Sequence, residues 1–252
     1  MKTLVILPVY NECNTLPITF KTVLEAAPFH VLVIEDNSTD GTREVARGLT
    51  AGEDRADLIE RPGKLGLGTA YIEGFRWGLE RGYDCFIEMD SDLSHDPRDL
   101  PRFLEAIESG SHLTIGSRYI GGTISVVGWD FKRLLLSKFG NFYAHTILGL
   151  PLTDMTSGFR AYSRKALESL RLEGIRSEGY AFQIEMAYYV WASGLKVTEI
   201  PIIFTERATG ASKMSKKIIR EAIRLPWRLR FSAIINTIKN HLGIKNSEVV
   251  KR

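Results

Sequence analysis

The amino-acid sequence predicts an α/β fold, a mostly parallel sheet flanked by helices. Two observations lead to this prediction. The first half of the 252-residue chain alternates short apolar runs with amphipathic helical stretches. The runs are apolar at nearly every position, which is typical of strands covered on both faces, as in a parallel sheet. Strand–helix units repeated at this length imply right-handed crossovers between neighbouring parallel strands.

The elements can be placed in order along the chain. Strands are expected over residues 3–7, 31–35, 58–61, 84–89 and 113–117, and helices over residues 15–27, 42–49, 69–81 and 100–109. In the helix over 69–81, Ile72, Phe75 and Leu79 recur at helical spacing and so share one face. After residue 120 we expect helices over 131–150 and 182–193 and strands over 159–163 and 197–204. The helical pattern that starts at residue 213 is expected to break before Pro226.

The composition is that of a soluble globular protein. Apolar residues make up 44% of the chain and charged residues 25%. Cys13 and Cys85 are too few to staple a chain of this size and have no metal-ligand spacing, which favours a reducing compartment. The N-terminal apolar run is broken by Pro8 and is too short for a signal peptide. No window offers the ~20 uncharged apolar residues of a membrane span.

The charge is distributed unevenly along the chain. The net charge is only +3, but residues 207–252 hold 12 basic and 2 acidic residues. A basic segment behind an acidic body favours a polyanionic partner, such as nucleic acid, an anionic membrane face or phosphates. Nucleic acid is disfavoured, because only Trp227 and Phe231 are interleaved with the basic residues. We expect a catalytic domain over residues 1–212 and a basic, amphipathic helical appendage over 213–252 that associates with a membrane surface.

Two stripes run along the expected appendage helix. The basic stripe consists of Lys217, Arg220, Arg224 and Arg228. The apolar stripe beside it consists of Ile218, Ala222, Leu225 and Leu229. We expect the apolar stripe and the basic residues to hold the protein at a bilayer surface.

The carboxyl ends of the strands are where an open α/β sheet binds its ligands. The sharpest feature there is Asp90-Ser91-Asp92, because residues i and i+2 of an extended chain face the same side. Two carboxylates suit Mg²⁺ or Mn²⁺; the alternative is a pair of turn-capping aspartates. A calcium loop is excluded, because His95 replaces its required glycine and Pro101 stands where its bidentate glutamate belongs.

Other candidate residues give weaker signals. Asp36, at the end of the second strand, is placed to accept hydrogen bonds from a base or ribose, or else to cap the next helix. The glycine-rich run 66–71 lacks the third glycine of a dinucleotide fingerprint, and no phosphate-loop motif occurs. The five histidines show no metal-ligand or triad spacing, so we expect them at the surface or satisfied structurally.

The motifs at the strand ends resemble those of the inverting family 2 glycosyltransferases, which have the GT-A fold. The resemblance is carried by LPVYNE from Leu7, EDNSTDGT from Glu35 and Asp90-Ser91-Asp92, in that order. Within this family, the dolichol-phosphate mannosyltransferases (polyprenol-monophosphomannose synthases) are similar in further motifs. These are KLGLGTAY from Lys64, GWDFKR from Gly128, SGFR from Ser157, GYAFQIEM from Gly179, and Arg207 with Gly210, Ser212 and Lys213. The similarity covers about residues 3–215.

The resemblance implies a role for each matching position. The nucleotide-sugar positions are matched by Pro8, Tyr10, Glu12, Ile34, Asp36, Asp90, Ser91, Asp92, Arg207 and Lys213. Asp90 and Asp92 match the metal ligands, and Ser94 stands where some members place a glutamine ligand. Arg118 and Arg133 are expected to hold the acceptor phosphate, and Asp92, Arg118 and Arg133 to form the catalytic group.

The implied reaction is the transfer of mannose from GDP-mannose to a polyprenyl (dolichyl) phosphate with inversion. Mg²⁺ or Mn²⁺ is expected to stabilise the leaving diphosphate. A phosphate acceptor is already an oxyanion, so it needs orientation by arginines rather than a strong base. A lipid acceptor implies a peripheral position on the cytoplasmic face of a membrane, with a membrane partner subunit as an option. The alternatives are a prenyl-phosphate glucosyltransferase, another family 2 transferase, or a non-catalytic membrane or nucleic-acid binding module.

Overall fold

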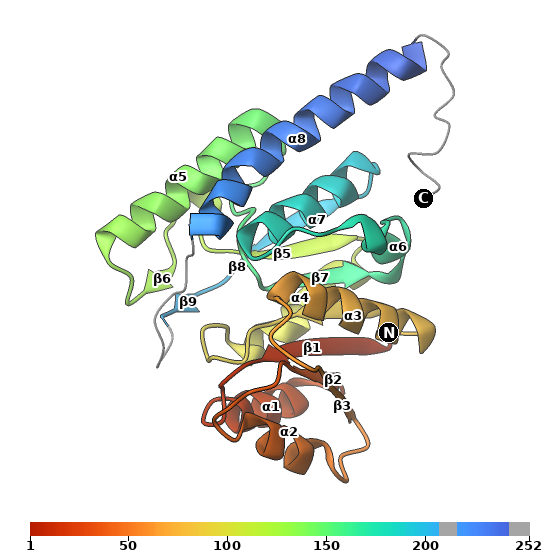
Figure 1. Ribbon diagram of the computed structural model, residues 1–252, viewed down its shortest axis with the longest axis vertical. Helices are drawn as coiled ribbons and strands as arrows, with labels where there is room; N and C mark the ends of the chain where they lie inside the picture. Colours follow the sequence, from red (N-terminus) through yellow and green to blue (C-terminus); the bar gives the residue numbers. More distant parts are fainter. Residues whose placement is uncertain (207–215, 242–252) are drawn as a thin grey trace.

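The computed structural model describes residues 1–206 and 216–241 of the chain, with side chains over 1–206 and 220–235. Its centre is a seven-stranded sheet of order β3-β2-β1-β4-β7-β5-β8 (Figure 1). The strands are β1 (Thr3–Val9), β2 (His30–Glu35), β3 (Ala56–Glu60), β4 (Cys85–Glu88), β5 (Leu113–Ser117), β7 (Arg160–Ser163) and β8 (Val197–Pro201). A small parallel pair, β6 (Val126–Val127) and β9 (Phe204–Thr205), lies beyond the carboxyl end of β5.

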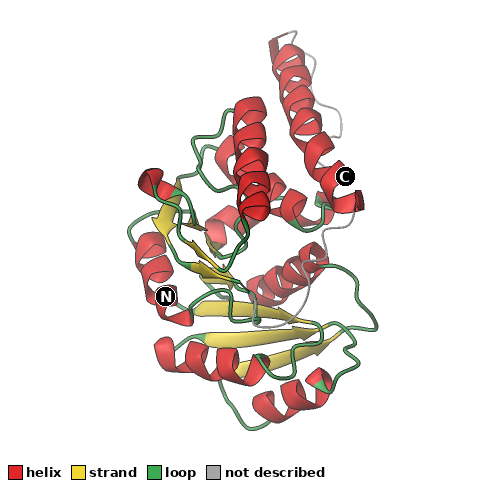
Figure 2. Cartoon of the chain, turned by 90° about the vertical axis from the view of Figure 1, so that its left-hand side faces the viewer, coloured by secondary structure: helices red, strands yellow, loops and turns green. Residues whose placement is uncertain are grey.

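Helices cover both faces of the sheet (Figure 2). They are α1 (Leu16–Ala26), α2 (Thr42–Thr50), α3 (Leu67–Glu80), α4 (Leu100–Glu108), α5 (Phe131–Leu148), α6 (Arg164–Glu168), α7 (Tyr180–Ala192) and α8 (Lys216–His241), with short 3₁₀ turns η1 (Pro97–Asp99), η2 (Ile120–Gly122) and η3 (Leu172–Gly174). The predicted α/β class is confirmed, and the elements that were predicted fall within a few residues of their expected places, whereas α6 and β6 were not predicted.

The sheet is parallel except for β7, which lies antiparallel between β4 and β5. The strand expected over 197–204 is divided into β8 and β9, because Ile202 turns into the core and the chain then pairs with β6. The register opposite β7 sets Glu88 beside Arg160, at the carboxyl end of β4. The fold therefore places a charged pair inside the sheet, close to the Asp90-Ser91-Asp92 turn.

Two apolar layers hold the helices on the sheet. On one face, Phe20 of α1, Ala46 of α2 and Phe103 of α4 belong to one buried cluster. On the other, Phe75 of α3 and Phe182 of α7 belong to a second cluster. Helix α3 lies especially close to the sheet, since a Cβ at its Gly78 would meet Phe86 at 2.6 Å and Leu4 at 2.7 Å.

Helices α5 and α8 lie side by side at one end of the molecule, and α8 extends beyond the body (Figure 1). Tyr143 of α5 joins them: its hydroxyl donates to the carbonyl of Ile223 at 2.9 Å and accepts from Trp227 Nε1 at 2.9 Å. The expected break before Pro226 is wrong, because α8 runs through it. A proline removes only one backbone donor, and here it is buried together with Leu225 and Leu229.

The apolar stripe expected to face a membrane is also placed differently. Leu225 and Leu229 are buried in the cluster that contains α3 and α7, so that face of α8 packs on the protein. A different face is exposed, with Ile223, Trp227, Phe231, Ile234 and Ile235. The boundary expected at residues 212–213 lies outside the described residues.

Candidate active site

The turns after β1 and β2 are cross-linked by short polar side chains. The backbone N–H of Asn11 donates to Ser38 Oγ at 3.0 Å, and Asn11 Oδ1 accepts from the N–H of Thr39 at 2.9 Å. Asn11 and Asn37 adopt left-handed backbone conformations, with φ of 60° and 58°. Asparagine tolerates this region better than most residues. The two strand ends therefore form one braced edge, which carries Pro8, Tyr10, Glu12 and Asp36.

Asp36 is buried at this edge and paired with a cation. Its Oδ1 lies 2.9 Å from Nη1 of Arg61, whose side chain is 2% exposed. Arg61 Nη2 also donates to Thr69 Oγ1 at 2.5 Å. Burial raises the pKa of Asp36, and the Arg61 charge acts in the opposite direction. Arg61 thus fixes the orientation of the carboxylate that was predicted to contact the nucleoside.

The loop between β3 and α3 borders the same edge. Lys64 Nζ lies 3.8 Å from the centre of the Tyr10 ring, a cation–π distance. Gly66, with φ of 104°, is the N-cap residue that leads into α3, so this glycine-rich run forms the turn before a helix. The Glu178 carboxylate lies against it and accepts from the N–H of Gly68 at 3.3 Å. Ile34, by contrast, is fully buried in the core.

The Asp90-Ser91-Asp92 turn follows β4. Asp92 is 4% exposed and accepts a hydrogen bond from the N–H of Ser94 at 3.0 Å. Leu93 between them has φ of 66°, an unfavourable conformation for leucine. The carbonyl of Ser91 accepts from Thr19 of α1 at 3.1 Å. Ser94 Oγ is buried without a hydrogen-bond partner in the described part of the chain, so this turn offers two carboxylates and an unsatisfied hydroxyl.

A buried polar group lies beneath this turn. Glu88 is fully buried and accepts from Gln183 Nε2 of α7 at 2.8 Å. Burial raises the pKa of Glu88 to about 8, although the Arg160 charge lowers it. Arg160 donates to three backbone carbonyls, those of Met155, Ser157 and Gln183, each at 2.7 Å. This group ties β4, β7 and α7 together under the candidate metal site.

Arg118 occupies the carboxyl end of β5, but in a buried ion pair. Its Nε and Nη2 donate to the two carboxylate oxygens of Asp154 at 2.6 and 2.7 Å, and its backbone N–H donates at 3.0 Å. Asn141 of α5 also donates to this carboxylate, at 3.3 Å. Burial alone would raise the pKa of Asp154, but Arg118 holds it below its usual value. Two nitrogens of the guanidinium expected at the acceptor phosphate are therefore already engaged.

Arg133, the other expected acceptor residue, lies at the start of α5. It pairs with Glu206 at 2.7 Å, and its guanidinium carbon lies 4.4 Å from the centre of the Trp129 ring. Trp129 meets Phe204 edge-on at 5.4 Å, and Phe204 meets His95 edge-on at 5.5 Å. These ring contacts link Arg118 and Arg133 to the Asp90-Ser91-Asp92 turn, which is the candidate metal site.

His95 is the residue through which these rings contact the Asp90-Ser91-Asp92 turn. Its Nδ1 accepts from the backbone N–H of Asp90 at 3.2 Å, and its ring stacks on Phe159 at 4.8 Å. Because Nδ1 accepts a hydrogen bond, the proton of a neutral imidazole ring must be on Nε2. His95 is 3% exposed. Its buried and hydrogen-bonded ring agrees with the expectation that the histidines have structural rather than ligand roles.

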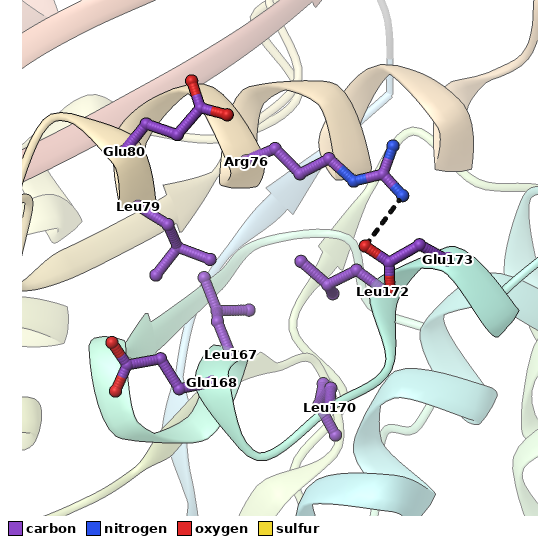
Figure 3. Close-up of a pocket in the computed structure, with 8 residues that line it drawn as sticks. All are labelled: Arg76, Leu79, Glu80, Leu167, Glu168, Leu170, Leu172 and Glu173. Carbon is purple, nitrogen blue, oxygen red and sulfur yellow. Dashed lines mark ion pairs between the residues drawn. The ribbon is translucent and has the colours of Figure 1, made fainter. Parts of the chain in front are cut away.

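A hollow of about 230 Å³ lies elsewhere, between α3 and the α6–η3 segment (Figure 3). It is lined by Arg76, Leu79, Glu80, Leu167, Glu168, Leu170, Leu172 and Glu173. Its one drawn ion pair, Arg76 with Glu173 at 3.3 Å, is largely exposed. The lining includes the C-terminal end of α3, which is opposite the strand ends that carry the candidate site. None of the predicted site residues that the structure describes lines it.

The structure thus brings most predicted site residues to one edge of the sheet and adds others. Arg207 and Lys213 lie outside the described residues. Sequence reasoning missed Arg61, although Arg61 ends the predicted third strand and so obeys the rule applied to the other strands. It also missed Asp154 and the role of Trp129 between two arginines, for which no local pattern gives a signal.

Comparisons with known proteins identify the family of the chain. The model for glycosyl transferase family 2 matches residues 4–171. The polyprenol monophosphomannose synthase of Mycolicibacterium smegmatis is 47% identical over 88% of this chain and 84% of its own length. The undecaprenyl-phosphate mannosyltransferase of Micrococcus luteus is 43% identical over 97% of this chain and 100% of its own.

A solved structure shows the same fold at low sequence identity. Glucosyl-3-phosphoglycerate synthase from Mycobacterium tuberculosis superposes with a TM-score of 0.66 at 19% identity, over 90% of this chain and 80% of that one. Another structure of that enzyme, with a TM-score of 0.62 at 20% identity and the same coverage, contains Mn²⁺ and UDP-glucose. The family model spans most of the sheet and the Asp90-Ser91-Asp92 turn, and both curated relatives extend over nearly the whole chain. The chain therefore belongs to glycosyl transferase family 2.

Proposed function

We propose that the protein transfers mannose from GDP-mannose to the phosphate of a polyprenyl phosphate, with inversion, yielding polyprenyl-phosphate mannose and GDP. The observation that carries this is the juxtaposition of two different charged groups. The acidic turn after β4 is joined to the Arg118–Arg133 cluster through the rings of His95, Phe204 and Trp129. The names of the two curated relatives support the same acceptor class.

The donor side fits a nucleoside diphosphate with a divalent metal. Asp90 and Asp92, with the unsatisfied hydroxyl of Ser94, offer the hard oxygen ligands that Mg²⁺ or Mn²⁺ prefers. Such an ion, when bound, stabilises the charge that develops on the leaving diphosphate. Among the described residues, no group of three or more His, Cys, Asp or Glu side chains is placed to hold a metal ion, so diphosphate and water oxygens would have to complete the coordination of an ion at Asp90 and Asp92. Asp36, fixed by Arg61, would accept hydrogen bonds from the nucleoside.

The acceptor side fits a phosphate that acts as its own nucleophile. A phosphate oxygen is anionic at neutral pH, so attack on the sugar carbon requires no proton transfer to a side chain. Arg133 would orient that oxygen and offset its charge. Arg118 would add its charge and could donate only through Nη1, because Asp154 and Thr156 engage its Nε and Nη2. Arg133 is the more available of the two, because its partner Glu206 is 44% exposed whereas Asp154 is fully buried.

The acceptor's lipid chain requires the enzyme to work at a bilayer. Among the described residues, no helix is both long and apolar enough to cross a membrane. The outer faces of α5 and α8 nevertheless expose a set of large apolar side chains: Phe131, Leu135, Leu136, Phe139 and Phe142 on α5, and Ile223, Trp227, Phe231, Ile234 and Ile235 on α8. A surface this apolar marks an interaction site. We assign it to the cytoplasmic face of a membrane, with the protein held peripherally.

The transfer reaction tests the function directly. Purified protein should move labelled mannose from GDP-mannose to a polyprenyl phosphate, and should not do so from UDP-glucose at a comparable rate. Asp92→Asn should abolish transfer, as should EDTA, while the matched variant Asp99→Asn on η1, where Asp99 pairs with Arg102, should remain active. Full activity in EDTA or in Asp92→Asn would contradict the metal assignment. Preference for UDP-glucose would contradict the donor.

Flotation with anionic liposomes tests the membrane surface. Phe139→Glu and Phe231→Glu should each reduce flotation, because each puts a charge into the apolar surface. Ile18→Glu is the control, since Ile18 is equally exposed, at 55%, but lies on α1. Equal flotation of the α5, α8 and α1 variants would contradict this placement of the membrane.

A further inference from the structure

Trp129 lies between β6 and α5, beside both arginines of the acceptor cluster. Its Nε1 is buried and has no hydrogen-bond partner in the described part of the chain. An indole N–H is a donor only, and native proteins rarely bury a donor without an acceptor because its desolvation is not compensated. Within residues 1–206 and 220–235, no oxygen accepts from this buried N–H.

The surroundings of the indole favour an anion as that acceptor. The guanidinium carbon of Arg133 lies 4.4 Å from the ring centre and that of Arg118 lies 5.3 Å from it. Both are cation–π distances, and together they place the two guanidinium carbons within about 10 Å of each other. Two cations and an unsatisfied N–H around one ring are the donors that a phosphate group accepts from.

The ring is also held firmly enough to orient its neighbours. Phe204 packs edge-on against it at 5.4 Å, and Phe204 in turn touches His95 beside Asp90. The Nε and Nη2 edge of Arg118 is fixed by the buried carboxylate of Asp154. The indole thus lies between Arg118, which is fixed in place, and Arg133, whose partner Glu206 is half-exposed.

We propose that Trp129 is part of the acceptor-phosphate site: its N–H donates to a phosphate oxygen, and its ring orients Arg118 and Arg133 around that phosphate. This inference rests on the proposed function, because it takes the ligand to be a prenyl phosphate. The competing explanation is a purely structural indole that packs against Phe204. That explanation predicts no selective effect on the acceptor.

The test separates the N–H from the ring. Trp129→Phe keeps an aromatic ring and removes the donor, whereas Trp129→Leu removes both. Trp77→Phe is the matched control, because Trp77 also stacks on an arginine, Arg81 at 4.2 Å, but lies on α3 away from the site. The measurements are the Michaelis constants for a short-chain prenyl phosphate and for GDP-mannose, the turnover number, and calorimetric binding of the prenyl phosphate alone.

Trp129→Phe should raise the acceptor Michaelis constant and weaken prenyl-phosphate binding about tenfold or more, the usual effect of losing a hydrogen bond to a charged group. The Michaelis constant for GDP-mannose and the behaviour of Trp77→Phe should stay unchanged. Trp129→Leu should weaken acceptor binding further and also lower turnover. If Trp129→Leu does not fold, Trp129→Phe alone decides.

The outcomes distinguish this inference from the function on which it rests. Normal transfer by the wild type with unchanged acceptor binding in Trp129→Phe would overturn the inference and leave the function standing. Equal increases in both Michaelis constants would also overturn it, since they would indicate a general structural defect. Failure of the wild-type protein to bind or use any prenyl phosphate would overturn both.

Discussion

Replacing Asp154 by asparagine should strongly destabilise the fold, although Asp154 lies in a loop. Asp154 and Arg118 are 0% and 5% exposed, and the carboxylate accepts three hydrogen bonds from Arg118 and one from Asn141. An asparagine of the same shape leaves the guanidinium buried without a counter-charge. Breaking one partner of a buried ion pair costs about 3–5 kcal/mol. In a chain of this size that corresponds to a fall in melting temperature of roughly 6–20 °C.

Urea unfolding followed by circular dichroism measures this free energy of unfolding. The control is Glu168→Gln, which breaks the exposed Arg164–Glu168 pair of 2.7 Å and should cost under about 1 kcal/mol. The double variant Arg118→Met with Asp154→Leu should recover part of the loss, because apolar replacements remove the unpaired charge. Recovery should be incomplete, since the backbone N–H of residue 118 still lacks the acceptor that Asp154 supplies.

The pH dependence supplies a second check on the same pair. Arg118 lowers the pKa of Asp154 in the folded protein, so the pair's contribution is present above the ordinary value of 3.8 and is lost as the pH falls through the lowered value. The difference between wild type and Asp154→Asn should therefore shrink in acid. A variant within 1 kcal/mol of wild type at neutral pH, or a difference that grows in acid, would refute the reasoning.

Three further predictions concern other parts of the site. Asp36→Ala should weaken GDP binding by roughly 1–3 kcal/mol, the range for a hydrogen bond to a charged group, and calorimetry showing unchanged affinity would remove Asp36 from the nucleotide site. Since burial raises the pKa of Glu88 to about 8, the folded protein keeps a proton that the unfolded chain releases above its ordinary value of 4.5. Stability should therefore fall by up to about 1.4 kcal/mol per pH unit between these values, and Glu88→Gln should flatten that slope in pH-dependent unfolding. Arg228→Gln should lower the melting temperature more than Arg224→Gln, because Arg228 pairs at 3.0 Å with the buried Glu185 of α7; equal effects would show that this pair contributes nothing.

The elements that could be predicted are those whose pattern is local. Strands such as β1 and β2 are continuous apolar runs, so burial on both faces is visible in the sequence itself. The failures lie where a distant contact decides. Pro226 continues α8 because Leu225 and Leu229 are anchored in the core. The two-residue strand β6 exists only because Phe204 and Thr205 return to pair with it.

The site divides in the same way. Asp36, Asp90 and Asp92 are predictable because they follow strand ends, where the fold class alone places ligands. Their partners are not: Arg61 reaches Asp36 from the end of the adjacent strand, and Asp154 reaches Arg118 across 36 positions. A lone arginine looks the same in sequence whether it binds a phosphate or a buried carboxylate. Only the tertiary structure separates the two.

The two halves of the site are held by different means. The described chain has three non-glycine residues with positive φ, Asn11, Asn37 and Leu93, and all three lie in turns after β1, β2 and β4. Such conformations persist only where the surroundings impose them. Asn11 has a polar side chain that bonds to the neighbouring turn, whereas Leu93 relies on the Asp92–Ser94 hydrogen bond beside it. The edge that we propose to bind the donor is therefore held in place by hydrogen bonds between short polar side chains and the neighbouring turn.

The edge that we propose to bind the acceptor is built from long rather than short side chains. Two of these long side chains are arginines. Arg118 is fixed by the buried Asp154, whereas Arg133 is paired with the half-exposed Glu206. A ligand phosphate can displace Glu206 at little cost, because an exposed ion pair contributes under about 1 kcal/mol, but it cannot displace the buried Asp154 without a much larger loss. Under the proposed function, Arg133 is therefore the residue whose pairing would change when an acceptor binds. It also begins α5, the helix whose apolar face we place at the bilayer that holds the acceptor's chain.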